Sequence, residues 1–261
     1  VLPFSLRVIR EAHVVLLEGV RGQNKAPGEF RKIPNWIGPP GCTMEDAQYI
    51  PVSAEKLPEF MGRWETFVHE PYPDVLVQLA LMHAEFEALH PFLDGNGRLG
   101  RMMIPLYLWQ RGLIQRPMFY VSAYFEAHRD QYYDGLLAVS QDDNWTGWCQ
   151  FFLEAIRIQA EDNLKKAQAI LKLYEEMKNK LPQLTHSQFA IRALDWLFCQ
   201  PIFNRSTFIN SSEIPRPTAH RILSVLEENN VLKVLVAGSG RRSAVLVFPR
   251  LLSIAEGKEI V

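Results

Sequence analysis

The sequence is poor in cysteine, in long apolar runs and in net charge, and each shortage excludes a class of protein. Three cysteines in 261 residues, with no Cys-x-x-Cys pair, argue against a disulfide framework or a zinc site and favour a reducing cytoplasm. No apolar run approaches the ~20 residues that a membrane-spanning helix needs, so we expect no membrane partner. The formal charge of −1 provides no general attraction to polyanions.

What remains is an ordinary globular composition, 48% hydrophobic and 22% charged. The length is sufficient for one large domain and one smaller domain. The N-terminal Val1-Leu2-Pro3-Phe4 has neither a charged leader region nor an initiating Met. We therefore expect a cytoplasmic chain whose upstream part is missing.

Apolar spacing predicts a mainly helical first part. Between the first two helices, residues 20–51 are rich in Gly and Pro, which predicts loops and a short hairpin. Pro91 favours a break between two helices over one continuous helix. The predicted helices cover residues 6–19, 74–90, 97–112, 126–140 and 144–180.

Pro182 is predicted to end the last of these helices, and we place a domain boundary there, giving domains 1–182 and 183–261. The second domain has a different pattern: a helix, a polar stretch, another helix and a hairpin around Gly238-Ser239-Gly240. This order is that of a winged helix-turn-helix domain. The corresponding ranges are 189–198, 204–213, 215–226, 231–236 and 243–248.

The most informative stretch is His90-Pro-Phe-Leu-Asp-Gly-Asn-Gly-Arg-Leu-Gly-Arg101. Gly95 and Gly97 allow unusual backbone angles just before a predicted helix N-terminus, where several N–H groups and the helix dipole favour an anion. Asn96 can donate to a phosphate oxygen. The loop therefore predicts a phosphate-binding site.

The same stretch carries the groups that phosphate chemistry needs. Asp94 is a hard oxygen ligand, suited to Mg²⁺ shared with phosphates. Arg98 and Arg101 are three residues apart, so on a helix they share a face and both can reach a polyphosphate. His90 has an imidazole that can remove a hydroxyl proton near neutral pH. Together these residues indicate attack on a nucleoside triphosphate.

The stretch matches the signature His-Pro-Phe-x-Asp-Gly-Asn-Gly-Arg-x-x-Arg at every defined position, and the chain therefore resembles the Fic family. The resemblance extends over roughly the first two-thirds of the chain, and the C-terminal part resembles the winged-helix appendage of many bacterial relatives. Other segments that look like the family are Val20-Arg21-Gly22, Pro27-Gly28-Glu29-Phe30-Arg31, Asn35-Trp36-Ile37-Gly38, Tyr49-Ile50-Pro51 and His83-Ala84-Glu85-Phe86-Glu87.

The resemblance implies a mainly α fold, with a helical core, a short β-hairpin flap and a winged helix-turn-helix tail. It also implies a protein adenylyltransferase that moves AMP from ATP to a Ser, Thr or Tyr hydroxyl, with possible modification of the chain itself. His90 would be the base and Asp94 the Mg²⁺ ligand. The phosphates would be held by the residues Gly95, Asn96, Gly97, Arg98 and Arg101.

Family analogy also places the nucleoside against the helix that carries Tyr132-Tyr133. Tyr133 is the expected contact and Ser140 a weaker one, although both tyrosines could instead pack in the core. Phe92 is expected to anchor the loop. The target segment would add as a strand to a flap made of Asp46, Ala47, Gln48, Tyr49 and Ile50. This mode reads little side-chain sequence, so the target protein stays unknown.

Many family members carry an inhibitory helix whose Glu pairs with the second motif Arg, here Arg101. Nothing before Leu6 can supply that helix, so we expect constitutive activity from these residues. Ser253-Ile-Ala-Glu-Gly257 has a Ser–Glu spacing one residue too short, and we interpret it as coincidence.

Two alternatives stay open. One is a DNA-binding regulator with a non-catalytic Fic domain. The segment from Thr185 onward has nine Lys or Arg residues and six Asp or Glu residues, so it carries a modest positive charge. The winged helix would contact DNA or protein, and a homodimer is left open. The other is transfer from GTP, UTP or CDP-choline. Phosphorylating relatives carry Lys in place of the second glycine, so Gly97 argues against phosphorylation.

Overall fold

A computed structural model describes residues 4–19, 24–39, 41–119, 121–240 and 242–260. The chain divides into two compact units, Val1–Glu161 and Asp162–Val261. Some predicted features lie outside the described residues: Val1 to Pro3, the Val20-Arg21-Gly22 part of the family resemblance, and Arg241 of the basic tail. No helix in the described ranges is long and apolar enough to cross a membrane.

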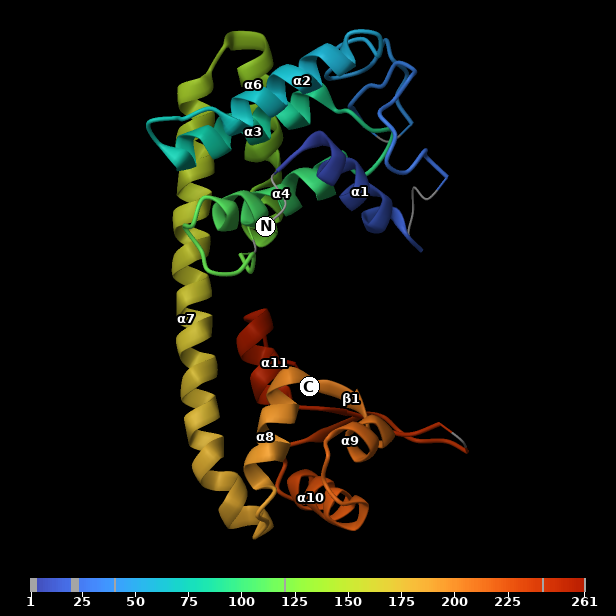
Figure 1. Ribbon diagram of the computed structural model, residues 1–261, viewed down its shortest axis with the longest axis vertical. Coiled ribbons are helices and arrows are strands. Elements are labelled where there is room, and N and C mark those ends of the chain that lie inside the picture. Colours follow the sequence, from blue (N-terminus) through green and yellow to red (C-terminus); the bar gives the residue numbers. More distant parts are fainter. Residues whose placement is uncertain (1–3, 20–23, 40, 120, 241, 261) are drawn as a thin grey trace. The chain divides into compact units, whose positions relative to one another are not determined.

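The first unit is helical (Figure 1). The helices expected at residues 6–19, 74–90 and 97–112 are confirmed, and His128 divides the helix expected at 126–140 into α5 and α6. One helix, α2, was missed. The helices are α1 (Leu6–Leu17), α2 (Leu57–His69), α3 (Val75–Leu89), α4 (Asn96–Gln110), α5 (Ser122–Ala127), α6 (Arg129–Asp142) and the first part of α7 (Trp145–Thr185).

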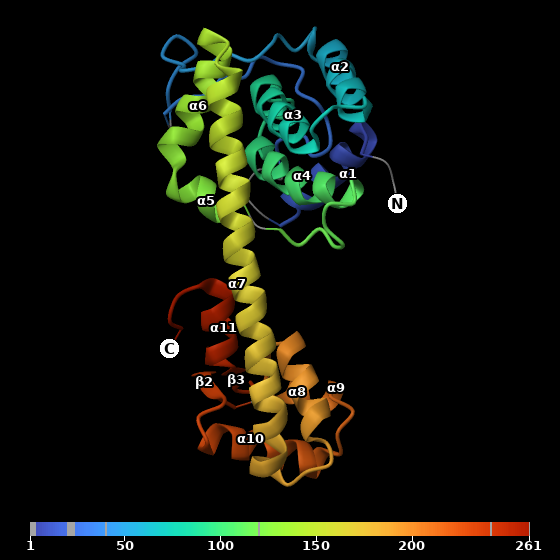
Figure 2. The same ribbon diagram turned by 90° about the vertical axis from the view of Figure 1, so that its left-hand side faces the viewer.

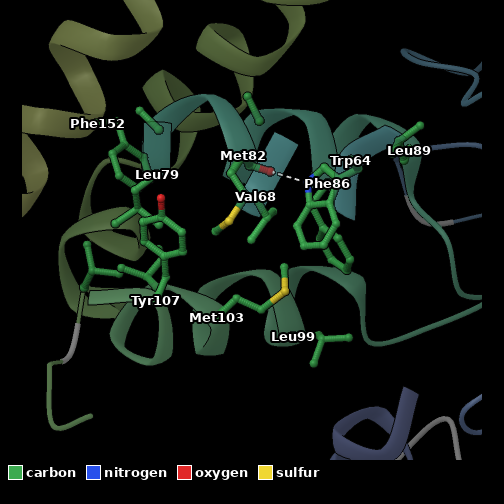
Figure 3. Packing of buried hydrophobic residues seen from close by; sticks show 14 of the residues in the cluster. Trp64, Val68, Leu79, Met82, Phe86, Leu89, Leu99, Met103, Tyr107 and Phe152 are labelled. Atoms are coloured by element: carbon green, nitrogen blue, oxygen red, sulfur yellow. Dashed lines mark hydrogen bonds between the residues drawn. The ribbon is translucent and has the colours of Figure 1, made fainter. Parts of the chain in front are cut away.

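The core of this unit lies where α2, α3 and α4 pack side by side (Figure 3). Asp74 starts α3 by accepting hydrogen bonds from the Leu76 and Val77 N–H groups at 2.8 and 3.1 Å, a side-chain N-cap. The indole of Trp64 on α2 donates to the Met82 carbonyl at 2.9 Å. Because α3 is buried on nearly all its faces, its position in the unit is fixed by packing.

Two left-handed residues make the turn between α3 and α4. His90 ends α3 with φ 46° and ψ 59°, and Gly95 precedes α4 with φ 84° and ψ 0°. Glycine adopts such angles without strain, whereas a histidine requires support from its surroundings. The break predicted from Pro91 is therefore confirmed.

The segment between α1 and α2 is mostly loop, with one antiparallel bridge between Ile37 and Tyr49. The Ile37 N–H donates to the Tyr49 carbonyl at 2.9 Å, and the Tyr49 N–H donates back at 3.1 Å. The described residues of this segment form this isolated bridge but no strand, so the short hairpin expected here is reduced to one residue pair.

We expected Pro182 to end the helix α7, but the helix continues to Thr185. The last turn is closed by the Thr185 hydroxyl, which donates to the Leu181 carbonyl at 2.8 Å, and by the His186 N–H, which donates to the Pro182 carbonyl at 2.9 Å. The division into two compact units falls between Glu161 and Asp162, inside this helix.

The second unit consists of the rest of α7, four further helices and a small antiparallel sheet (Figure 2). The sheet order is β1-β3-β2, with Phe203 and Val234 both paired to Leu246. The predicted polar stretch 204–213 contains α9, and β1 and α11 were not predicted. The elements are α8 (Ala190–Cys199), β1 (Ile202–Asn204), α9 (Arg205–Ser211), α10 (Arg216–Glu228), β2 (Lys233–Val236), β3 (Val245–Val247) and α11 (Pro249–Glu256).

Candidate active site at the junction of α3 and α4

His90, the predicted base, lies at the end of α3 with a defined tautomer. Its Nδ1 is 3.3 Å from the Glu87 carbonyl oxygen. A carbonyl can only accept, so Nδ1 carries the proton and Nε2 keeps its lone pair. Burial lowers the pKa of His90 to about 4. The imidazole is therefore neutral at pH 7 and able to accept a proton through Nε2.

The N-terminus of α4 gathers several polar groups. Its N-cap residue is Gly95, which has no side chain and so makes no side-chain capping bond. The Asp94 carboxylate accepts from the Gly95 N–H at 2.6 Å and lies 3.5 Å from the Arg98 guanidinium. A carboxylate, an arginine and backbone donors are thus gathered at one helix end, where the helix dipole favours negative charge.

The Asn96 side chain, which was predicted to contact phosphate, bonds the backbone of the loop instead. It is 1% exposed, accepts from the Phe92 N–H at 2.8 Å and donates to the Phe92 carbonyl at 2.8 Å. The amide therefore braces the loop, and a phosphate contact from Asn96 would come from its backbone N–H. Phe92 is fully buried and stacks on His13 at 3.8 Å between ring centroids, which confirms its role as an anchor.

A buried carboxylate that the sequence analysis missed lies behind the loop. Glu87 is 8% exposed, and its Oε1 has no hydrogen-bond partner within the described part of the chain. A Cβ atom at Gly100 would lie 2.2 Å from this oxygen, and one at Gly97 would lie 3.9 Å from the other oxygen. The two glycines leave the space that Glu87 fills. Burial raises the pKa of Glu87 to about 7, and the charge of Arg101 opposes this shift.

The two motif arginines therefore have different surroundings. Arg98 lies beside Asp94, whereas Arg101 lies against Gly97 and near Glu87 and the Tyr132 hydroxyl. Arg98 belongs to the helix end, and Arg101 belongs to the buried polar group behind it.

The tyrosine pair on α6 is also divided. Tyr132 is 3% exposed, and its hydroxyl is 2.9 Å from His83 Nε2. His83 is fully buried, and burial lowers its pKa to about 3, so it is a neutral core residue. Tyr133 is 46% exposed and has the Arg129 guanidinium over its ring. Of the pair, Tyr133 is the one with a ring accessible to a nucleoside.

The flap is tied to both the loop and α6. The Asn35 side chain donates to the Phe92 carbonyl at 3.2 Å, and the Tyr49 hydroxyl lies near the Ser140 side chain. Asp46 accepts from the Thr43 hydroxyl at 2.8 Å, while Ile50 is 50% exposed. Ala47 is half-buried and Gln48 exposed. The predicted flap residues thus form one segment beside the junction.

His13 was given no role by the sequence analysis, yet it joins α1 to the loop. Its Nδ1 accepts from the Gly28 N–H at 2.9 Å, so its Nε2 carries the proton and donates to the Asp94 carbonyl at 2.9 Å. Burial lowers its pKa. The sequence offered no way to find this contact, because residues 13 and 94 meet only in the folded chain.

These features place a neutral histidine, a carboxylate, an arginine and a helix N-terminus at one junction. Residues 3–108, which include the whole motif, match the family model of the Fic/DOC family, so this part of the chain is similar to Fic/DOC domains. Over 41 residues the chain is 44% identical to a probable protein adenylyltransferase of Aquifex aeolicus. The aligned stretch is 16% of this chain and 13% of that relative.

Among solved structures, a Fic family protein from Desulfovibrio desulfuricans G20 has a similar fold. The match has a TM-score of 0.56 and 19% sequence identity, and it covers 93% of this chain and 68% of that chain. A Fic-domain signaling protein from Bacteroides thetaiotaomicron matches with a TM-score of 0.41 and 21% identity over 61% of this chain and 64% of that chain. At these identities, the first match supports the fold.

Proposed function

We propose that the chain is a protein adenylyltransferase that moves AMP from ATP to a hydroxyl of another protein. The observation that carries the proposal is the junction of α3 and α4, where one short loop joins a neutral histidine to a helix N-terminus that carries Asp94 and Arg98. The Fic/DOC match and the name of the Aquifex relative favour AMP as the transferred group.

In the proposed reaction, the target hydroxyl gives its proton to His90 Nε2 as its oxygen attacks the α-phosphorus. A new oxygen–phosphorus bond forms, and the bond between the α-phosphorus and the bridging oxygen to the β-phosphate breaks. Pyrophosphate leaves with that electron pair. The first-turn N–H groups of α4 and the Arg98 guanidinium would stabilise the phosphate charge.

Asp94 fits a shared magnesium ion, because Mg²⁺ in nucleotide sites commonly takes one or two carboxylates together with substrate phosphates. Bound there, the ion would neutralise phosphate charge. Within the described residues, no group of three or more His, Cys, Asp or Glu side chains could hold a metal alone, so phosphates would have to complete the coordination.

Intact mass spectrometry of the chain and of added bacterial proteins, after incubation with ATP, GTP, UTP or CDP-choline, tests the proposal. We expect an AMP-sized mass increase with ATP and magnesium. Asp94→Ala should lose magnesium-dependent ATP binding in calorimetry, whereas Asp142→Asn, which changes an exposed carboxylate in the same unit, should keep it. An adduct from another nucleotide would keep the chemistry and correct the donor.

A second function is supported by the second unit, whose order of helices and strands is that of a winged helix-turn-helix. We propose that α10 enters a DNA groove, since the second helix of such a motif does so. Arg216, His220 and Arg221 are exposed on α10. Arg216→Ala with Arg242→Ala should weaken duplex binding and its salt dependence, and Arg192→Ala on α8 should not. Equal duplex binding by the parent, the Arg216→Ala with Arg242→Ala variant and the Arg192→Ala variant would favour protein docking instead.

A further inference from the structure

Arg31 donates to three successive carbonyls at the end of α3. Its Nη2 is 3.3 Å from the Leu89 oxygen, its Nε is 3.0 Å from the His90 oxygen, and its backbone N–H is 2.8 Å from the Pro91 oxygen. The residue is 3% exposed. One buried side chain and its own backbone therefore hold the whole turn that carries His90.

This turn requires such support. The last carbonyls of a helix have no partners within the helix, and a cation near a helix C-terminus is favourable. His90 also has φ 46°, a left-handed conformation that is unfavourable for a non-glycine residue and persists only where its surroundings impose it. The guanidinium of Arg31 supplies both the donors and the positive charge.

The same guanidinium reaches the segment that contains the flap. Its Nη2 also donates to the Val52 carbonyl, and its Nη1 is 3.5 Å from the Ile33 carbonyl. These residues lie on either side of the bridge between Ile37 and Tyr49. Arg31 thus connects the two ends of the flap segment to the backbone of His90.

We propose that Arg31 is a positioning residue that sets the orientation of His90 and links it to the flap. The inference rests on the proposed function, since it concerns the base of that reaction. Arg31 touches no reacting atom in this scheme. Its contribution is to fix the turn, and its positive charge also favours the neutral imidazole.

The experiment compares Arg31→Met and Arg31→Lys with the matched control Arg10→Met in the full chain. Arg10 also donates to a backbone carbonyl in the N-terminal segment, that of Gly28 at 2.6 Å, and its guanidinium lies over the Phe30 ring. Neither contact involves the end of α3. Lysine keeps the charge and can serve part of the carbonyl set. For each chain, kcat, KM for ATP, ATP affinity and thermal stability are measured.

Arg31→Met should lower kcat by about 10- to 100-fold, because small displacements of a catalytic group have effects of this size. ATP affinity should stay within about twofold, since the phosphate loop is unchanged. Arg31→Lys should recover part of kcat, and Arg10→Met should resemble the parent chain. A purely structural role would lower stability without separating kcat from ATP affinity.

Nuclear magnetic resonance of the His90 ring supplies a readout that needs no activity. The signals, identified by their loss in His90→Ala, should shift in Arg31→Met and Arg31→Lys and stay in place in Arg10→Met. If the parent chain transfers nothing, the proposed function fails while this test still decides the role of Arg31. If Arg31→Met does not fold, Arg31→Lys decides. Parent-like kcat and His90 signals in a folded Arg31 variant would overturn the proposal.

Discussion

The two units differ in what they bury. Within the described residues, the second unit buries two polar side chains, those of Thr185 and Ser212. The first unit buries a larger set, most of it around the turn between α3 and α4: His13, Arg31, Gln78, His83, Glu87, Asn96 and Gln159. Burying polar groups costs free energy unless each finds a partner.

The difference indicates that the core of the second unit is mainly apolar, whereas the first unit buries polar groups at a cost in folding free energy. In the second unit, apolar side chains of α7, α8, α10 and the sheet form the core. In the first, the buried side-chain atoms without a hydrogen-bond partner in the described part of the chain include a carboxyl oxygen, that of Glu87, whereas in the second the Ser212 hydroxyl is such an atom. Buried carboxyl groups of this kind are concentrated at functional sites.

The largest expected effect is a difference between the parent chain and Glu87→Gln in how the free energy of unfolding depends on pH. Burial raises the pKa of Glu87 from 4.5 to about 7. Between these values the folded chain holds the proton more tightly than the unfolded chain, so this stabilising contribution is lost as the pH rises from 4.5 through 7. As the pH rises through this range, the free energy of unfolding of the parent should fall by up to about 3 kcal/mol relative to that of the variant, since one pKa unit corresponds to about 1.36 kcal/mol.

Urea unfolding at pH 5 and pH 8 measures this difference. The comparison between chains removes the titrations that both share. Equal pH dependence in the two chains would mean that the Glu87 carboxyl is not confined in an apolar environment.

A smaller effect is expected from filling the space between α4 and Glu87. Gly100→Ala places a Cβ atom 2.2 Å from Glu87 Oε1, and overpacking of this kind costs about 2 kcal/mol. The matched control is Gly62→Ala in α2, where a Cβ would meet nothing within 4 Å. That change should stabilise the chain by about 0.5–1 kcal/mol, because alanine is the better helix former.

Thermal unfolding of both alanine variants tests the comparison. Opposite signs are the expected result. Two stabilised variants would show that the close approach of Gly100 and Glu87 relaxes without cost.

The smallest effect compares one buried polar side chain from each unit. Asn96→Ala leaves the Phe92 N–H without its partner, while the Phe92 carbonyl keeps the Asn35 amide as a donor. The loss should be about 1 kcal/mol, near the lower end of the range for a buried group without a partner. The Ser212 hydroxyl has no partner among the residues that the structure describes. Ser212→Ala should therefore be neutral or slightly stabilising. Chemical unfolding of both variants checks this, and an equal loss would erase the proposed difference between the units.

Local patterns predicted much of the fold. The apolar spacing found α1, α3, α4 and most of α7, and Pro91 with two glycines found the turn. The helix α2 was missed although Leu57, Met61, Trp64 and Val68 recur at helical spacing and are buried, so its signal was present. The strand β1 was missed because three residues carry too little pattern.

The site was predictable as far as it is local in sequence. His90, Asp94 and Arg98 lie within nine residues and meet at one turn. The supports come from elsewhere: His13 binds the Asp94 carbonyl across 81 positions, and Arg31 binds the His90 carbonyl across 59. The sequence analysis assigned the Asn96 side chain to phosphate. Its contacts with Phe92 could not be found from the sequence, because they depend on the backbone path of the folded loop.

The central claim is that the junction of α3 and α4 transfers AMP, the part of ATP that contains the α-phosphate, with His90 as the base. The most direct measurement incubates the chain and candidate target proteins with ATP that is labelled at either the α- or the γ-phosphate. We predict protein-bound label from α-labelled ATP alone, reduced by about 10²- to 10⁴-fold in His90→Ala, while that variant still binds ATP. Protein-bound label from γ-labelled ATP, or undiminished transfer by His90→Ala, would contradict the account.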